Sequence, residues 1–335
     1  MRSRSRSQRP AGDESGGSLM ADKIKLNKPW LVAVWPGMGH VAISAGYYLM
    51  AKLGMHLMAE FQAEELFDVE YVEVKRGLIR TGRLPRSRFF AWIDPKGHHD
   101  LVVFIGEAQP PRGKLAFCRR LIEFAKDLGV ERVFTFASMA TQMHPSHNSR
   151  VFGAATDEAT LDELKQLELT PLDDGQISGL NGVLLGVAAE AGLPGACLLG
   201  EMPHIFAQLP FPKAALAVLE VFSTIAAIPI DLDELAEQAA DVERKLGQLL
   251  SQVEHAIESH QEAGEEEPPF PTEPDDEGEG ETLSLSPDDQ RLLDRLFDEA
   301  ARDRAKAYEL KRELDRLGVY NEYEDRFLDL FKKPE

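Results

Sequence analysis

Cysteine is scarce in this chain, because only Cys118 and Cys197 occur among its 335 residues. The two lie far apart, with no Cys-x-x-Cys spacing and no histidine cluster beside either one. A disulfide framework or a zinc site needs several ligands at short, regular spacings. The sequence therefore predicts two buried, reduced thiols, no metal site, and a reducing, cytoplasmic location.

Positive charge is also in short supply, since 37 Lys and Arg face 57 Asp and Glu, for a net charge of −20. Such a surface repels phosphate backbones and anionic lipids. No uncharged apolar run reaches membrane-spanning length, and residues 1–20 lack the apolar centre of a signal peptide. We therefore expect neither a nucleic-acid partner nor a membrane partner.

The uneven distribution of charge divides the chain. Residues 262–281 contain ten carboxylates and no basic residue, together with several Pro and Gly. Such a segment buries too little apolar surface to offset its ordering entropy, which predicts an acidic disordered linker over 262–285. Residues 1–27 are predicted to be a basic disordered leader, in which Met20 is an alternative start. One α/β domain over 28–261 and a helical C-terminal arm over 286–335 complete the predicted organisation.

Short β-branched or aromatic runs alternate with amphipathic stretches between residues 29 and 228. This alternation is typical of an α/β fold, in which helices flank a mostly parallel central sheet. Several runs are apolar on both faces, as central parallel strands are. The predicted strands are 30–35, 69–74, 88–93, 101–105, 132–136, 150–154 and 196–199.

Helices are predicted where apolar residues recur every three or four positions behind a capping residue. The long polar helix is expected to lie along the core or along a neighbouring subunit. Ser286-Pro287 opens the arm as an N-cap followed by a first-turn proline. The predicted helices are 114–128, one starting at 156, 178–192, 213–228, 231–260 and a single arm helix over 286–317.

The arm carries an apolar stripe that continues into an aromatic end segment, and such a set usually marks docking. Two alternatives stay open. The arm reaches a partner protein, or it folds back on its own core, because a tethered segment has a high effective concentration. The predicted partner-binding residues are Leu292, Leu296, Leu310, Leu314, Tyr320, Tyr323, Phe327, Leu330 and Phe331.

A glycine-rich loop follows the first predicted strand and opens a helix. Gly37, Gly39 and Ala42, with His40 between them, match the Gly-x-Gly-x-x-Ala spacing that lets backbone amides approach a phosphate. Glu60 lies near the position of a ribose-binding acid, but no further element of a dehydrogenase follows. The motif therefore predicts either a weak phosphate site or, more simply, a tight packing turn.

Two Gly-Glu corners follow predicted strands and bring Glu107, Gln109 and Glu201 to strand ends. The carboxyl edge of a parallel sheet is where α/β proteins place ligand sites. These side chains and the Gly37 loop are candidates for one pocket. The alternative, which we favour, is that the carboxylates only cap turns.

Residues 173–182 are dense in turn formers just before a helix N-terminus. Asp174, Gln176, Gly179 and Asn181 are therefore candidates for holding an anion or a peptide carboxylate. The two histidines of 144–148 are separated by a proline and lack a nearby acid, which favours a polar loop over a metal site. No catalytic residue is predicted, since no Ser-His-Asp or Cys-His arrangement occurs in a nucleophile context.

Four motifs carry a resemblance to a known family: WPGMGHVAISAGYYLMAKLGM, GEAQP, DDGQISGLNGVLLG and PKAALAVLEVFSTIAAIPID. In this order they resemble the proteasome assembly chaperone family. The form is the archaeal and bacterial one related to the second eukaryotic chaperone, once grouped with ATP-grasp proteins. The resemblance covers residues 28–252.

The resemblance implies a nucleoside-phosphorylase-like and peptidyl-hydrolase-like α/β fold, self-assembly into a small ring, no cofactor, and binding rather than catalysis. Archaeal relatives are thought to contact proteasome-type rings through a hydrophobic-Tyr-any tail. This chain ends in LFKKPE and lacks the penultimate tyrosine. The predicted function is a non-catalytic, assembly-chaperone-like protein that self-associates and binds a protein partner. The alternative is a nucleoside- or nucleotide-handling enzyme that uses the Gly37-Gly39 loop.

Overall fold

The computed structural model describes residues 25–69, 72–75, 77–167, 169–263 and 285–332. Most of the predicted leader and nearly all of the predicted acidic linker lie outside these residues. Within the described ranges, no helix combines the length and the apolar character that crossing a membrane requires.

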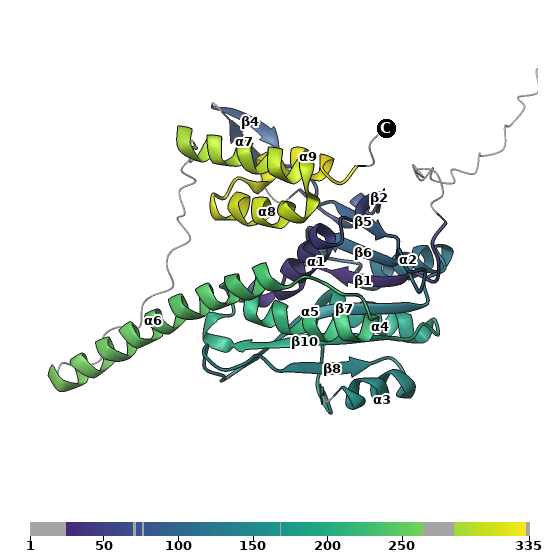
Figure 1. Cartoon of the computed structure of the whole chain (residues 1–335), viewed down its shortest axis with the longest axis horizontal. Coiled ribbons are helices and arrows are strands. Elements are labelled where there is room, and N and C mark those ends of the chain that lie inside the picture. Colours follow the sequence, from purple (N-terminus) through teal and green to yellow (C-terminus); the bar gives the residue numbers. More distant parts are fainter. Residues whose placement is uncertain (1–24, 70–71, 76, 168, 264–284, 333–335) are drawn as a thin grey trace, which may run out of the picture.

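An eight-stranded mixed sheet forms the centre of the molecule, in the order β2-β5-β6-β1-β7-β10-β8-β9 (Figure 1). Its strands are β1 (Trp30–Val34), β2 (His56–Glu60), β5 (Ser87–Trp92), β6 (Leu101–Gly106), β7 (Arg132–Thr141), β8 (Val151–Ala155), β9 (Thr170–Pro171) and β10 (Gly195–Pro203). β1 pairs in parallel with β6 and β7, and β10 pairs in parallel with β7. Antiparallel pairs join β6 to β5, β5 to β2, and β10 to β8. The predicted α/β fold with a mostly parallel sheet is confirmed.

A second sheet holds only β3 (Val72–Lys75) and β4 (Leu78–Thr81). The predicted strand over 69–74 is therefore found in part, as β3, but it does not join the main sheet. Gly77, at φ 76°, lies in the two-residue connection between the strands, and a left-handed residue there suits a tight hairpin. The alternation of valines was a correct strand signal, but the turn sends the chain into a hairpin instead of the main sheet.

Helices cover both faces of the main sheet, and α6 extends away from it (Figure 1). They are α1 (Val41–Lys52), α2 (Lys114–Asp127), α3 (Glu158–Gln166), α4 (Gly179–Glu190), α5 (Pro212–Ala226) and α6 (Asp233–Ala263). The pleat of β1 divides the core, because successive side chains point to opposite faces. Leu31 and Ala33 join the cluster that α2 and α4 cover. Val32 and Val34 join the cluster that α1 and α5 cover.

The arm consists of α7 (Pro287–Arg302), α8 (Ala307–Arg316) and α9 (Tyr320–Asp329), and it packs beside α1 (Figure 1). The predicted single helix over 286–317 is wrong, because the chain leaves helical geometry at Asp303, where φ is −135° and ψ is 103°. The Asp303 carboxylate accepts a hydrogen bond from Ala305 N at 3.0 Å and so starts a new helical turn. The apolar stripe is thereby folded into two antiparallel segments.

Candidate functional site

The Gly37 loop forms a packing turn. Gly39 has φ +62°, and a Cβ built on it would lie 2.6 Å from Met202 Sδ. Gly39 N donates to Ala207 O at 2.8 Å, and His40 N donates to Gly37 O at 3.0 Å. A phosphate cradle needs free backbone amides pointing at the ligand. These two amides already have partners within the chain, so the predicted cradle lacks them.

Gln109 occupies the N-terminus of α4. Its Oε1 accepts from Leu180 N at 3.1 Å, and its Nε2 donates to Pro36 O at 3.5 Å. Gly179, at φ +74°, fits closely against it, since a Cβ there would lie 2.8 Å from Gln109 Oε1. The amide oxygen therefore takes the place in which a ligand carboxylate would meet the helix dipole.

The other residues of the turn-rich segment do not converge on Gln109. The backbone oxygen of Asn181 accepts from Thr135 Oγ1 at 3.2 Å, while Asp174 and Gln176 are exposed. Asp174 lines a shallow groove of about 450 Å³ beside α4 and β8. The structure thus brings Gln109 and Gly179 together but leaves the rest of this predicted set apart.

Glu201, at the end of β10, is held by its own neighbours. It is 2% exposed, and both carboxylate oxygens accept from the Arg150 guanidinium, at 2.7 and 2.8 Å. Thr141 Oγ1 donates to the same carboxylate at 2.8 Å. The Arg150 hydrogen bonds are the main reason that the pKa of Glu201 is lowered. Glu201 Oε2 also accepts from Arg150 N at 3.4 Å, as expected of a carboxylate that caps a turn.

Glu107, at the end of β6, belongs to a larger group that joins the core to the arm. We call Glu60, Arg83, Arg88, Glu107 and Glu324 the carboxylate-arginine cluster. Arg88 Nη1 lies 2.6 Å from Glu107 Oε1 and 3.0 Å from Glu324 Oε1, and Arg88 Nε lies 3.2 Å from Glu60. Arg83 forms ion pairs with Glu107, at 3.4 Å, and with Glu324. The side chain of Glu324 on α9 is 2% exposed and that of Arg88 on β5 is 5% exposed, so this is a largely buried charge network.

Two carboxylates of the cluster, Glu107 and Glu324, have pKa values shifted in opposite directions. Burial, and then a hydrogen bond with Glu107, raise the pKa of Glu324 to about 7. Burial also opposes ionisation of Glu107, but hydrogen bonds from Glu324 and Arg86 N, with the Arg83 and Arg88 cations, hold its pKa below the ordinary value. Two adjacent carboxyls that cannot both ionise freely behave in this way. Protonation of Glu324 is therefore coupled to docking of the arm on the core.

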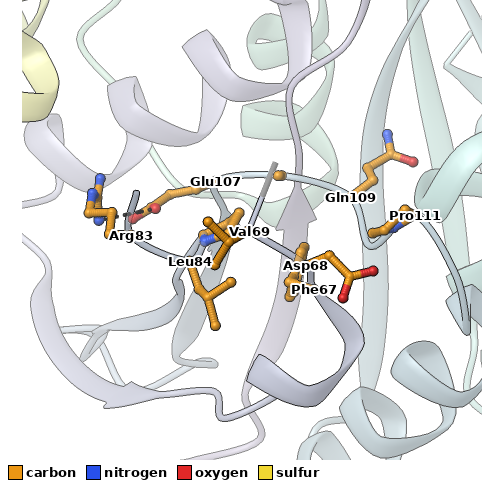
Figure 2. A pocket seen from close by; sticks show the side chains of 10 residues that line it. Phe67, Asp68, Val69, Arg83, Leu84, Glu107, Gln109 and Pro111 are labelled. Carbon is orange, nitrogen blue, oxygen red and sulfur yellow. Dashed lines mark ion pairs between the residues drawn. The ribbon is translucent and has the colours of Figure 1, made fainter. Parts of the chain in front are cut away.

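A pocket of about 270 Å³ lies beside this cluster (Figure 2). Glu107 and Gln109 line it, whereas Glu201 and the Gly37 loop do not. Figure 2 shows Arg83 at one end of the pocket, paired with Glu107, and Gln109 toward the other. This pocket therefore brings together two of the four strand-end features, Glu107 and Gln109. Glu107 Oε2 accepts from Arg86 N at 2.9 Å, so it too caps a turn.

Sequence analysis missed the partners that hold these carboxylates. Arg88 left a signal, because it interrupts the otherwise buried strand SRFFAW of β5. A charge within a buried strand usually has a partner. Glu324 left a similar signal, since it lies on the apolar side of α9 at helical spacing from Tyr320 and Phe327. Its partner Arg88, however, is more than 200 positions away in the chain. Glu60 pairs with Arg88 and is not placed as a ribose-binding acid.

The arm is held on its own core through aromatic contacts as well. Tyr47 on α1 and Tyr320 on α9 share a hydrogen bond of 3.0 Å between their hydroxyls. The Lys311 ammonium lies 3.9 Å from the Tyr320 ring centroid and 4.7 Å from that of Tyr47. Leu57 N donates to Phe331 O at 2.9 Å, so the end of the arm adds to the edge of β2. This is the fold-back arrangement, one of the two alternatives.

The predicted partner-binding residues take part in this docking. All nine belong to the apolar cluster on the α1 side of the sheet. Partner binding through them requires the arm to leave the core, and it stays a prediction. The buried members are Leu296, Leu310, Leu314, Phe327 and Phe331, and the half-buried ones are Leu292, Tyr320, Tyr323 and Leu330.

Cys118 and Cys197 are both free and buried, as predicted. Among the residues that the structure describes, no three His, Cys, Asp or Glu side chains are grouped so as to hold a metal ion. Each of the two Gly-Glu corners is held by ion pairs and hydrogen bonds within the chain, and the Gly37 turn is held by backbone hydrogen bonds.

The fold and the carboxyl edge of its sheet define an α/β protein whose strand-end carboxylates are bound by arginines. The sequence profile of the PAC2 family matches residues 31–250. The chain therefore belongs to the PAC2 family.

Solved structures and a sequence relative extend this comparison. Pyrococcus furiosus PbaB, described as an archaeal proteasome activator, is 25% identical with a TM-score of 0.60, over 70% of this chain and 98% of PbaB. Pyrococcus furiosus PbaA, described as an archaeal homologue of proteasome-assembly chaperone, is 25% identical with a TM-score of 0.53, over 70% of this chain and 97% of PbaA. The uncharacterised protein MJ1210 of Methanocaldococcus jannaschii is 28% identical over 75% of this chain and 94% of its own length.

Proposed function

We propose that this chain is a non-catalytic, assembly-chaperone-like protein that self-associates through its α/β core and binds a protein partner. Membership of the PAC2 family and the descriptions of PbaA and PbaB support the proposal. The observation that carries it is the arrangement of side chains at the carboxyl edge of the sheet. Glu107 and Glu201 are bound by arginines, while apolar side chains on the loops after β1 and β10 are exposed.

These exposed side chains form a surface that we call the rim patch: Met38, Ile205 and Leu209. They are 46%, 54% and 42% exposed. The loops that carry them are joined by backbone hydrogen bonds, from Gly39 N to Ala207 O at 2.8 Å and from Phe211 N to Gly39 O at 2.9 Å. The patch is therefore firmly supported, and apolar side chains on a rigid support are suited to protein contacts.

The geometry gives less support to the alternative, a nucleoside- or nucleotide-handling enzyme. Its phosphate site would need the amides of Gly39 and His40, which are bonded to Ala207 O and Gly37 O. Its acid-base group would be Glu107 or Glu201, and the pKa of each is lowered. A general base works best with a pKa near neutrality, so a lowered value is unfavourable.

The experiment measures the molar mass of the purified chain by light scattering over a range of concentrations. We expect a self-associated species that Ile205→Asp or Leu209→Asp shifts toward the monomer. Leu115→Asp, at a residue on α2 that is 46% exposed, is the matched control and should change nothing. A chain that is monomeric at every concentration contradicts self-association.

Partner binding is tested with a purified archaeal 20S proteasome, because both Pyrococcus relatives are described by their connection with proteasomes. We expect co-elution that the Ile205→Asp variant weakens and the Leu115→Asp variant preserves. Turnover of a nucleoside or of ATP by the same preparation would favour the enzyme alternative, provided that Glu107→Gln abolishes it.

A further inference from the structure

The β3-β4 hairpin and the residues just before it hold more of the exposed large apolar side chains than any other short stretch of the described residues. Twelve large apolar side chains are exposed in the described part of the chain, and five of them fall between residues 69 and 79. The most exposed are Ile79 at 73%, Leu78 at 65% and Val74 at 59%. Scattered single residues need no explanation, whereas a contiguous set of this kind marks an interaction surface.

The register of the hairpin separates its two faces. Val72 is paired with Thr81, and Val74 is paired with Ile79. Cross-strand partners lie on the same face, and positions two apart share a face, so these four positions form one largely apolar face. Arg80 is paired with Glu73, and Lys75 with Leu78, so these positions lie on the opposite face.

Both outer edges of the hairpin are open. Among the described strands, β3 pairs only with β4, and the pair stands apart from the main sheet. An isolated two-stranded hairpin is marginally stable in water, and an unpaired edge is a template for another strand. A third strand would complete the backbone hydrogen bonds of one edge and place its own side chains beside those of the apolar face.

A groove lies at the foot of the hairpin. The pocket of about 270 Å³ and a second one of about 260 Å³ share Phe67, Arg83 and Leu84 in their walls (Figure 2). Val69, which is 47% exposed, lines the first pocket and connects the groove with the hairpin. Arg83 Nη1 is buried and makes no hydrogen bond with a described residue, although it lies 3.4 Å from Glu107. Asp68 and Glu107 also line the first pocket, so the basic residues that could meet an acidic segment lie on the hairpin and not in the groove.

Charge indicates the kind of ligand. The hairpin, residues 72–81, contains three basic residues and one acidic one, within a chain whose net charge is −20. This local reversal favours an acidic partner by complementarity. In an added strand, apolar and acidic residues would alternate, because its side chains alternate between the valine face and the Arg80 face.

We infer that the β3-β4 hairpin binds an extended, acidic segment of a partner protein, added as a third strand with apolar and acidic residues in alternation. The inference deepens the proposed protein-binding function and rests on it. Main-chain hydrogen bonds supply affinity in this mode, and the alternating side chains supply specificity.

The test uses fluorescein-labelled peptides of about ten residues, the upper end of common strand lengths, and the full chain, with binding followed by fluorescence anisotropy. One peptide alternates valine and glutamate, a second alternates valine and lysine, and a third has the composition of the first with its valines and glutamates in separate halves. We expect the first peptide to bind at least about tenfold more tightly than the other two. Equal binding of all three, or no binding, overturns the inference.

Variants locate the site. Val74→Asp and Arg80→Glu should each weaken binding of the valine-glutamate peptide by about tenfold or more, since each places a carboxylate against it. Ile93→Asp, at a residue 51% exposed outside the hairpin, is the matched control and should bind normally. Unchanged melting temperatures establish that the variants are folded. Equal loss in the control variant overturns the assignment to the hairpin.

Two other occupants are outcomes of the same experiment. If Val74→Asp lowers the molar mass of the chain, the hairpin is a contact between copies, and the inference is overturned. If replacing the carboxylates of residues 262–281 by amides tightens peptide binding, the occupant is the chain's own acidic segment, which also overturns it. Failed peptide binding by a chain that still self-associates through the rim patch leaves the proposed function intact.

Discussion

Replacement of Arg88 by methionine tests whether the carboxylate-arginine cluster holds the arm on the core. The Arg88 side chain is 5% exposed and lies within 3.2 Å of Glu60, Glu107 and Glu324. Methionine keeps much of the side-chain volume and removes the charge. Glu107 and Glu324 are then left with Arg83 as their shared cation.

The expected loss follows from the buried, uncompensated charge. Removing one partner of a buried ion pair usually destabilises a protein by about 3–5 kcal/mol. The loss should depend on pH, because without Arg88 the pKa of both carboxyls rises and protonation relieves the burial of charge. The variant should therefore lose more stability at high pH than at low pH.

The assay compares urea unfolding of the full chain with the rate at which a protease separates the arm at residues 264–284. Arg88→Met should lower the free energy of unfolding or release the arm after cleavage. Arg86→Met is the matched control, because Arg86 is 43% exposed and pairs with Asp325, which is 85% exposed. An exposed pair contributes about 1 kcal/mol or less. If Arg88→Met behaves like Arg86→Met at every pH, the cluster does not hold the arm.

Three further predictions concern the buried groups. The pKa of Glu324 is raised from 4.5 to about 7, so between these pH values the docked arm keeps a proton that the free arm releases. Docking should therefore weaken as the pH rises from about 4.5 to about 7. Glu324→Gln should remove this pH dependence in protease-release measurements. Phe331→Ala should lower the free energy of unfolding by about 3–5 kcal/mol, measured by urea titration, since Phe331 is fully buried. Burial raises the pKa of both Cys118 and Cys197 to about 12, so neither thiol should react with a thiol reagent until urea unfolds the chain.

The sequence predicted elements whose side-chain pattern matches their final burial. α2 and α5 have apolar residues at helical spacing and lie where the pattern places them. β2 was missed, because HLMAE is made of good helix formers and becomes a strand only by pairing with β5. β9 has two residues, too few for any periodic signal.

The site was predicted less completely than the fold for a specific physical reason. The motifs at Gly37, Glu107 and Glu201 marked true turns at strand ends. The residues that hold these motifs come from other elements of the fold. Arg150 before β8 binds Glu201, and Arg88, which binds Glu107, also binds Glu324 on α9. A carboxylate in a sequence does not reveal whether an arginine will neutralise it, and that decides between a reactive group and a structural one.

The docked arm leaves the surfaces proposed for binding exposed, although Arg83 at the foot of the hairpin pairs with Glu324 of the arm. The family profile ends at residue 250, before the arm begins. With the arm docked, Ile205 of the rim patch remains 54% exposed and Ile79 of the hairpin 73% exposed. Phe331, in contrast, is buried, and its carbonyl accepts from Leu57 N. Docking through the chain end would expose this ring and break that hydrogen bond, whereas docking through the rim patch or the hairpin requires neither change. Contacts made by the core are therefore favoured over contacts made by the tail.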